Sequence, residues 1–203
     1  MCNEYRFKTA LDRIVDEFSQ LQLPIHWAGG APNLEPREAV RPTEAGPIVI
    51  GTPDGPELKQ LRWGFPRDKG GPVINFRSED RRFPSGRCLI LADGFYEFTG
   101  DRAPKAKWLF TAADDGLFAI AGLVREDRFT MLTCAPGPDI APYHNRQIVI
   151  LPRDRWAAWL GPADAQPLLE PLLAGSLKVA QVRKGAEPTP AARIDLPIQG
   201  DLL

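Results

Sequence analysis

The sequence contains few cysteines, few histidines and no long apolar run. Among its 203 residues are three cysteines and two histidines. The cysteines are odd in number and show no Cys-x-x-Cys spacing, which argues against a disulfide framework and a zinc site. No run approaches the roughly 18 apolar residues of a membrane span, and no charged start leads into a short apolar stretch, as in a signal peptide. We expect a cytoplasmic chain with no metal, cofactor or membrane association.

An excess of charge of either sign is also missing. Lys plus Arg number 25 against 26 for Asp plus Glu, which gives a formal net charge of -1. A strongly basic nucleic-acid binder would carry more positive charge, so any contact with DNA must come from a local basic groove. The length suits one domain with a substantial core. We predict a monomer with a single domain over residues 1–203, of which 185–203 form a loosely held extension.

One segment near the start has helical periodicity. After Thr9, apolar residues recur at helical spacing while charged residues take the opposite face. We predict a helix there, capped by Thr9 with Asp12 and ended by Pro24. Residues 28–47 are rich in Pro and Gly, which predicts a long surface loop.

The rest of the chain has the pattern of short strands followed by short helices. Apolar runs bounded by Gly, Pro or Asp predict a mostly antiparallel sheet system. These runs cover residues 47–50, 73–76, 88–92, 108–111, 117–123, 129–134 and 148–151. Two short helices are predicted after them, one with Trp156 and Trp159 and one with the leucines of residues 168–173.

Cys2 is the most informative single residue. Removal of Met1 would leave a cysteine with both a free α-amine and a thiol. Such a 1,2-aminothiol condenses with an aldehyde to an imine and then closes a thiazolidine ring. The two groups ordinarily titrate at roughly 7.7–8.0 and 8.5, so each is partly deprotonated near neutral pH. Position alone leaves a second interpretation open, in which Cys2 is a chance residue in a disordered start.

Polar residues inside apolar strands are the other anomaly, because a buried amide or charge is costly without a partner or ligand. Asn75 and Arg77 flank Phe76 and would share one face of a strand, where they suit an anionic, oxygen-rich ligand or face water. Glu97 lies between two aromatic residues, so it is either a desolvated general acid with a raised pKa or an outward-facing residue. His144 precedes a strand and is suited to proton transfer near neutral pH, although a loop histidine is often only solvent-exposed.

Several short motifs occur in an order that identifies a family. They are the N-terminal Met-Cys, the RWG of 62–64, the N-x-R of 75–77, the run RCLILADGFYEF, the AGL of 121–123, the strand FTMLT and the H-x-R of 144–146. The chain resembles the SOS response-associated peptidase (SRAP) family, whose members shield abasic sites in single-stranded DNA by covalent crosslinking. The resemblance covers residues 1–160.

This resemblance implies a fold, a reaction and a set of site residues. The fold is α+β, with mostly antiparallel strands curled into a barrel-like core and peripheral helices. The reaction is a thiazolidine crosslink through Cys2, with associated AP-lyase and autopeptidase activity. Asn75 would position the N-terminus and the sugar, Glu97 would act as an acid/base group, and His144 would transfer protons. Arg77 would hold the phosphate beside the lesion.

The DNA partner needs phosphate contacts and stacking surfaces. Arg62 joins Arg77 as a candidate cation, and Trp63 is a candidate wedge or platform for the flanking bases, or else a core residue. The chain also departs from the family pattern, since Glu4 stands where a basic residue is usual and would repel a nearby phosphate. Phe98 stands where the family has Trp.

Two further functions remain open at this point. In the first, a peptidase or amidohydrolase, Cys2 attacks an acyl group while its own α-amine acts as the base. The second is a non-catalytic binder of single-stranded DNA or of a protein, with Asn3 and Glu4 as signs of decay. An oligonucleotide that bears an aldehyde separates these two functions from crosslinking. The crosslinking function gives a stable adduct, the peptidase gives none without an acyl substrate, and the non-catalytic binder gives only reversible binding.

Overall fold

The computed structural model describes residues 2–162 and 164–186, and this part of the chain is mostly β with two short helices. The helices are α1 (Leu11–Gln20) and α2 (Trp156–Leu160), and Arg153–Arg155 and Gln166–Leu168 form 3-10 turns. The strands are β1 (Tyr5–Phe7), β2 (Arg37–Val40), β3 (Ala45–Thr52), β4 (Gly55–Trp63), β5 (Asn75–Arg77), β6 (Arg87–Ala92), β7 (Gly94–Thr99), β8 (Ala106–Ala112), β9 (Phe118–Arg125), β10 (Arg128–Cys134), β11 (Gln147–Ile148), β12 (Ile150–Leu151) and β13 (Leu177–Arg183).

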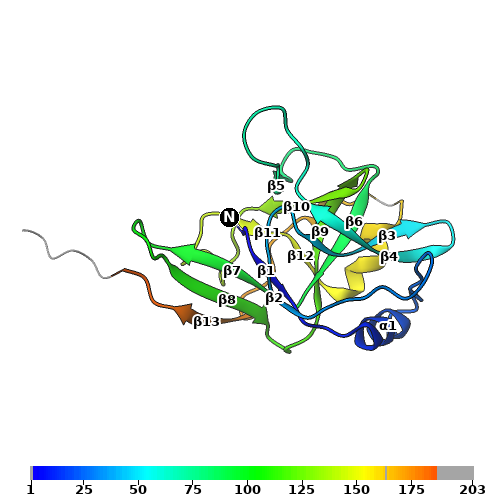
Figure 1. Cartoon of the computed structure of the whole chain (residues 1–203), viewed down its shortest axis with the longest axis horizontal. Helices are drawn as coiled ribbons and strands as arrows, with labels where there is room; N and C mark the ends of the chain where they lie inside the picture. The colour runs from blue at the N-terminus through cyan, green and yellow to red at the C-terminus, as the bar shows by residue number, and fades with distance from the viewer. Residues whose placement is uncertain (1, 163, 187–203) are drawn as a thin grey trace, which may run out of the picture.

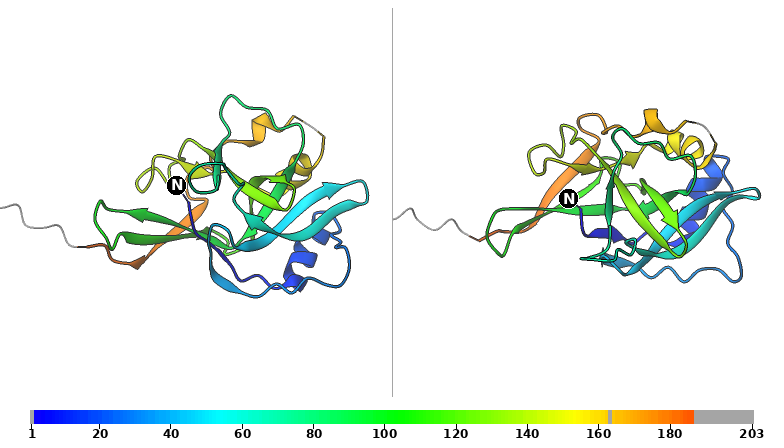
Figure 2. Two further views of the ribbon diagram at one scale, coloured as in Figure 1. Left: turned by 45° about the horizontal axis from the view of Figure 1, so that its top comes forward. Right: turned by 90° about the horizontal axis from the view of Figure 1, so that it is seen from above.

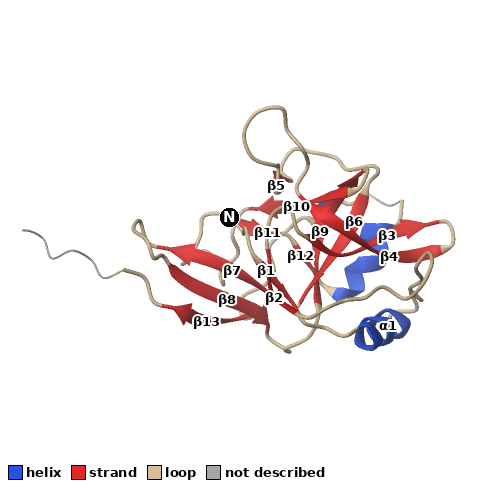
Figure 3. Cartoon of the chain, viewed as in Figure 1, coloured by secondary structure: helices blue, strands red, loops and turns tan. Residues whose placement is uncertain are grey.

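The larger of the two sheets closes into a ring that resembles a barrel. Its strand order is β11-β10-β4-β3-β6-β9-β12, and an additional pairing of β9 with β10 closes the circle (Figures 1 and 2). Most ladders are antiparallel, but β4 and β5 both run parallel to β10. Helix α1 lies outside the strands (Figure 3). The predicted barrel-like core with peripheral helices is confirmed, and the sheet is mixed in direction.

The core of the ring is centred on β6. All six residues of this strand are buried, because β3 and β9 pair with its two edges and α2 packs against it. The indole of Trp159 on α2 donates a 2.8 Å hydrogen bond to the carbonyl of Cys88. Burial of one Leu or Ile side chain contributes about 1.5–3 kcal/mol, so this continuous apolar strand is a major source of stability.

The smaller sheet holds the start of the chain. Its order is β13-β8-β7-β1-β2, so β1 lies between β7 and β2. Tyr5 of β1 lies opposite Phe95, and its ring packs edge-on against Trp63 with centroids 5.5 Å apart. The chain therefore enters the fold as an internal strand with Cys2 just before it. Figure 1 shows the blue start of β1 beside β7.

Several local expectations from the sequence are confirmed and others are wrong. The first helix is present, but Thr9 does not cap it. Its N-cap is Ala10, with no side-chain hydrogen bond, and the Thr9 hydroxyl donates instead to Asp93 over 3.4 Å. The predicted strands are found, and the last of them is divided at Val149. This residue donates to Leu132 of β10 and accepts from Ala121 of β9, which ties the segment to two strands of the ring.

Residues outside the apolar runs were less well predicted. The supposed loop 28–47 contains β2 and the start of β3, while β1, β4 and β13 were not predicted. The helix predicted over residues 168–173 is wrong, since only a 3-10 turn at Gln166–Leu168 forms there. Pro171 has no N–H to donate and interrupts a helix at this point. The predicted extension, 185–203, lies outside the described residues except for 185 and 186. No helix in the described part of the chain is long and apolar enough to cross a membrane.

Candidate active site around Cys2

Cys2 is held in a fixed, buried position. Its side chain is 1% exposed, and the thiol donates a 3.4 Å hydrogen bond to the backbone carbonyl of Glu4. The carbonyl of Cys2 itself accepts a 2.7 Å hydrogen bond from the side-chain amide of Asn75. The start of the chain is therefore ordered at Cys2, which contradicts the part of the alternative interpretation that places this residue in a disordered start.

Asn75 reaches Cys2 from the other sheet. Strand β5 runs parallel to β10, with Asn75 next to Met131. Because Asn75 Nδ2 donates to Cys2, its Oδ1 is the free end of the amide. This oxygen is buried and has no hydrogen-bond partner among the described residues. A buried acceptor without a partner costs about 1–3 kcal/mol, and a ligand hydroxyl or N–H group would satisfy it.

Glu97 lies on β7, directly beside the strand that follows Cys2. The N–H of its neighbour Tyr96 donates to the carbonyl of Glu4 over 3.0 Å. Burial raises the pKa of Glu97 from 4.5 to about 7. Burial, and after it the negative charge of Glu97, raise the pKa of the Cys2 thiol. Near neutral pH the carboxyl group can therefore give or take a proton while the thiol keeps its own.

The His144 loop is anchored on the strand that pairs with Glu97. Trp108 of β8 is the direct cross-strand partner of Glu97. The ring of Tyr143 packs against Trp108 with centroids 4.8 Å apart and against Phe110 at 5.2 Å. This contact places the backbone of His144 next to the sheet that carries Glu97.

The hydrogen bond that His144 accepts determines the tautomer of its neutral imidazole ring. Nδ1 accepts a 3.0 Å hydrogen bond from the backbone N–H of Arg146, so the proton of the neutral imidazole is on Nε2. Burial lowers the pKa of His144 and keeps the ring neutral at physiological pH. Arg146 is itself fixed, because its guanidinium pairs with Glu79 and donates to the carbonyl and hydroxyl oxygens of Thr133, each over 2.9 Å.

The three residues predicted to bind DNA lie in different surroundings. Arg77 is exposed at the end of β5, two residues from Asn75 and thus on the same strand face. Arg62 is exposed on β4 beside Arg128, and no hydrogen bond or ion pair in the described structure joins it to Cys2 or Asn75.

Trp63 requires a correction. The prediction of a wedge or platform for bases is wrong, because the side chain is 0% exposed. Its indole N–H donates to the carbonyl of Ile74 over 2.9 Å, and its ring stacks near Phe129 with centroids 6.4 Å apart. Trp63 is the core residue of the alternative interpretation.

Sequence reasoning missed residues that act across strands. Lys107 of β8 forms an ion pair with Glu4, and Trp108 and Tyr143 carry the His144 loop. The only sequence signal among these residues was the aromatic Tyr143 directly before the candidate residue His144. Their partners depend on strand register, which the sequence pattern does not specify.

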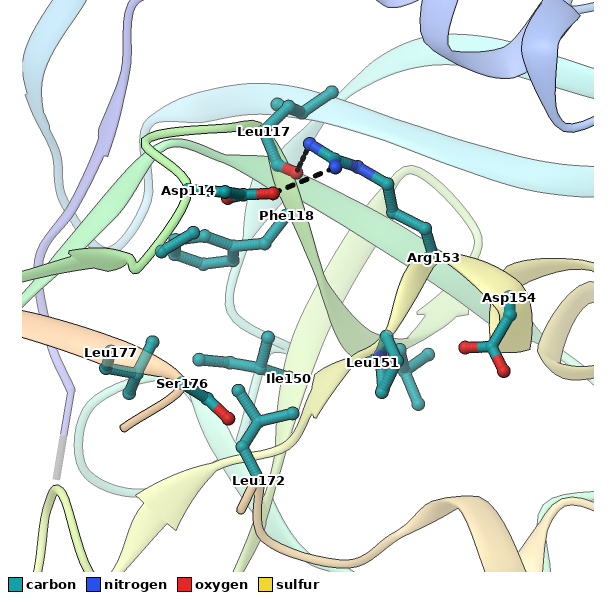
Figure 4. Close-up of a pocket in the computed structure, with 12 residues that line it drawn as sticks. Asp114, Leu117, Phe118, Ile150, Leu151, Arg153, Asp154, Leu172, Ser176 and Leu177 are labelled. Carbon is teal, nitrogen blue, oxygen red and sulfur yellow. Dashed lines mark hydrogen bonds and ion pairs between the residues drawn. The ribbon is translucent and has the colours of Figure 1, made fainter. Parts of the chain in front are cut away.

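A cavity elsewhere in the molecule does not belong to this site. It has a volume of about 370 Å³ and apolar walls that include Phe118, Ile150 and Leu172 (Figure 4). The guanidinium of Arg153 at its edge donates to Asp114 over 3.0 Å and to the carbonyl of Leu117 over 3.3 Å (Figure 4). Cys2, Asn75, Glu97 and His144 do not line it.

Comparison with known proteins gives consistent matches over almost the whole chain. A sequence model of a family described as SOS response associated peptidase (SRAP) matches residues 1–187. The abasic site processing protein YoaM of Bacillus subtilis (strain 168) is 29% identical over 211 residues, covering 90% of this chain and 91% of that protein. The abasic site processing protein YobE of the same organism is 28% identical over 212 residues, covering 90% and 94%. A crystal structure from Bordetella bronchiseptica has the same fold, with a TM-score of 0.71, 24% identity and coverage of 90% of this chain and 100% of that one.

Proposed function

The chain belongs to the SOS response associated peptidase (SRAP) family, and from this premise we propose that it processes abasic sites in single-stranded DNA by covalent attachment through Cys2. The names of its relatives YoaM and YobE support the substrate. The observation that carries the proposal is the fixed, buried position of Cys2, whose carbonyl accepts a 2.7 Å hydrogen bond from Asn75 and whose thiol donates to the carbonyl of Glu4.

The proposed reaction uses the two nucleophiles of one residue. Removal of Met1 gives Cys2 a free α-amine. In its ring-opened form an abasic deoxyribose carries an aldehyde, and the amine nitrogen adds to that carbon. Loss of the aldehyde oxygen as water leaves an imine. The thiol sulfur then adds to the imine carbon while its proton passes to the nitrogen, which closes the thiazolidine ring. Water is the only product released, and no oxidant or reductant is consumed.

Glu97 supplies the proton transfers in this scheme. A carboxyl group with a pKa of about 7 is partly protonated near neutral pH, so it can donate a proton to the departing oxygen and, once ionised, carry the thiol proton to the nitrogen. The raised pKa of the Cys2 thiol suits this order of events, because the sulfur keeps its proton until it adds to the imine.

His144 and Arg77 would act on the sugar and its phosphate. Neutral His144, with its proton on Nε2, suits the opening of the closed hemiacetal by proton transfer. Arg77 is exposed on the strand face of Asn75 and would bind the phosphate next to the lesion. The buried Oδ1 of Asn75 would accept a hydrogen bond from the α-amine or a sugar hydroxyl. An AP-lyase step would use the same imine.

The test is the intact mass of the purified chain before and after incubation with single-stranded DNA that contains one abasic site. We expect the mass of a chain without Met1, and then a denaturation-resistant adduct whose mass is the sum of chain and DNA less one water. The same DNA with an intact base is the control. A chain that lacks Met1 and binds the abasic DNA but gives no covalent adduct would overturn the proposal.

A peptidase activity on the chain itself is the second candidate, since the family description names a peptidase. When the protein is made without any methionine aminopeptidase, this activity predicts that the wild type loses Met1 and that Cys2→Ala retains it. Loss of Met1 from that variant would exclude self-processing and leave the crosslinking proposal intact.

A further inference from the structure

Glu4 is an acidic residue that the fold buries. Its side chain is 9% exposed and forms an ion pair with the ammonium group of Lys107, which is 18% exposed. Arg41 contributes a second cation 3.6 Å from the same carboxylate oxygen. A carboxylate with so little solvent depends on its partners, because removal of one member of a buried ion pair is strongly destabilising.

The backbone of Glu4 is the point where Cys2 meets the sheet. Its carbonyl accepts two hydrogen bonds, one from the Cys2 thiol at 3.4 Å and one from the N–H of Tyr96 at 3.0 Å. Lys107 contacts both residues that flank this junction. Its ammonium group pairs with the Glu4 carboxylate and lies 3.7 Å from the centroid of the Tyr96 ring. The ammonium group of Lys107 thus contacts both the residue that precedes β1 and a residue of β7, and it holds the N-terminal end of β1 against β7.

We propose that Glu4 and Lys107 form a positioning pair that holds the sulfur of Cys2, separately from Asn75, which holds its carbonyl. An arginine at position 4 would place a second positive charge next to Lys107. The ammonium group of Lys107 therefore requires an acidic or neutral residue at position 4. The inference rests on the proposed function for the use made of the sulfur, namely ring closure after the imine has formed. Glu4 is then a working part of the site and not a sign of decay.

Four variants test the pair. Lys107→Gln removes the charge, Lys107→Arg keeps it, and the double variant Glu4→Gln/Lys107→Gln replaces the ion pair by two amides that can hydrogen-bond. The control is Lys8→Gln, which removes an ion pair with Glu38 on the same sheet, where the side chains are 45% and 67% exposed. The first measurement is the rate at which iodoacetamide alkylates Cys2 without DNA, located by peptide mass. The second is the ratio of borohydride-trapped imine to thiazolidine on abasic DNA.

Lys107→Gln should expose Cys2 and raise its alkylation rate about tenfold, because the end of β1 opens locally. The same variant should shift the products toward imine, since Asn75 still holds the backbone while the sulfur is free. Lys107→Arg, the double variant and Lys8→Gln should stay close to wild type in both measurements. If Lys107→Gln does not fold, wild-type behaviour of Lys107→Arg and of the double variant still supports the pair.

Two results would overturn the inference. One is an unchanged alkylation rate in folded Lys107→Gln. The other is a double variant whose products on abasic DNA shift toward imine as much as those of Lys107→Gln, which would assign Lys107 to the DNA itself and not to Glu4. Because alkylation needs no DNA, a chain that never forms an adduct would contradict the proposed function and leave the positioning pair to be decided by the first measurement.

Discussion

The side-chain amide of Asn75 donates a 2.7 Å hydrogen bond to the backbone carbonyl of Cys2, a residue 73 positions earlier in the chain. This contact joins the two sheets, since Asn75 lies on β5 beside β10 and Cys2 precedes β1. It also orients the amide, so that Oδ1 remains buried without a protein partner in the described structure. The rigid ring thus positions a residue that belongs to the smaller sheet.

The first prediction concerns this contact. Asn75→Ala removes the donor and should slow crosslinking about two- to tenfold, because the loss of a hydrogen bond worth about 0.5–1.5 kcal/mol frees the backbone of Cys2. The measurement is the single-turnover rate of adduct formation on abasic single-stranded DNA. Gln60→Ala is the matched control, since Gln60 also donates a side-chain amide to a backbone carbonyl, that of Asn33 at 2.9 Å. Equal rates for both variants would remove Asn75 from the site.

The second prediction follows from the raised pKa of Glu97. The folded chain binds this proton more tightly than the unfolded chain, because the pKa rises from 4.5 to about 7 on burial. The stabilisation is therefore fully present below pH 4.5 and is lost as the pH rises through about 7. The free energy of unfolding of wild type relative to Glu97→Gln should fall between about pH 5 and pH 8. A difference between the two proteins that does not vary over this range would contradict the assignment.

Some of this site could be predicted from the sequence. Asn75 and Glu97 stood out as polar residues within apolar strands, and the structure places both beside the residues around Cys2. Helix α1 followed from periodicity because it buries Ile14 and Phe18 on one face, and strands such as β6 and β9 followed from their runs of buried apolar residues. These features depend on the order of apolar and polar residues within one segment, which can be seen in the sequence of that segment alone.

The rest depends on how distant strands pair. The ion pair of Glu4 with Lys107 joins residues 103 positions apart, and no local pattern indicates it. Trp63 looked like a base platform beside an arginine, but the closing of β4 onto β10 buries it. Strand β13 was missed because its residues are mostly exposed, so it has neither an apolar run nor a clear alternation.

The third prediction concerns the packing of β1 against the ring. A β-carbon at Gly46 would lie 1.8 Å from the hydroxyl oxygen of Tyr5, a buried side chain. Gly46→Ala should therefore destabilise the protein by about 1–3 kcal/mol through overpacking and should slow crosslinking, because β1 carries Cys2. Chemical denaturation gives the free energy. Gly30→Ala is the control, since a β-carbon there meets no atom within 4 Å, and it should behave as wild type in both assays.

The last prediction separates the two nucleophiles of Cys2. The thiazolidine needs nitrogen and sulfur from the same residue, so a chain that retains Met1 should form no adduct, even though its thiol is intact. Cys2→Ser keeps the amine and should give only an imine, which borohydride traps and which is lost without it. Cys88→Ser is the control, because Cys88 is a buried cysteine outside the site, and it should crosslink as wild type does. The products are distinguished by denaturing gel shift with and without borohydride. A denaturation-resistant adduct formed equally well by Met1-bearing protein or by Cys2→Ala would show that another group attacks the aldehyde, and the aminothiol mechanism would then be wrong.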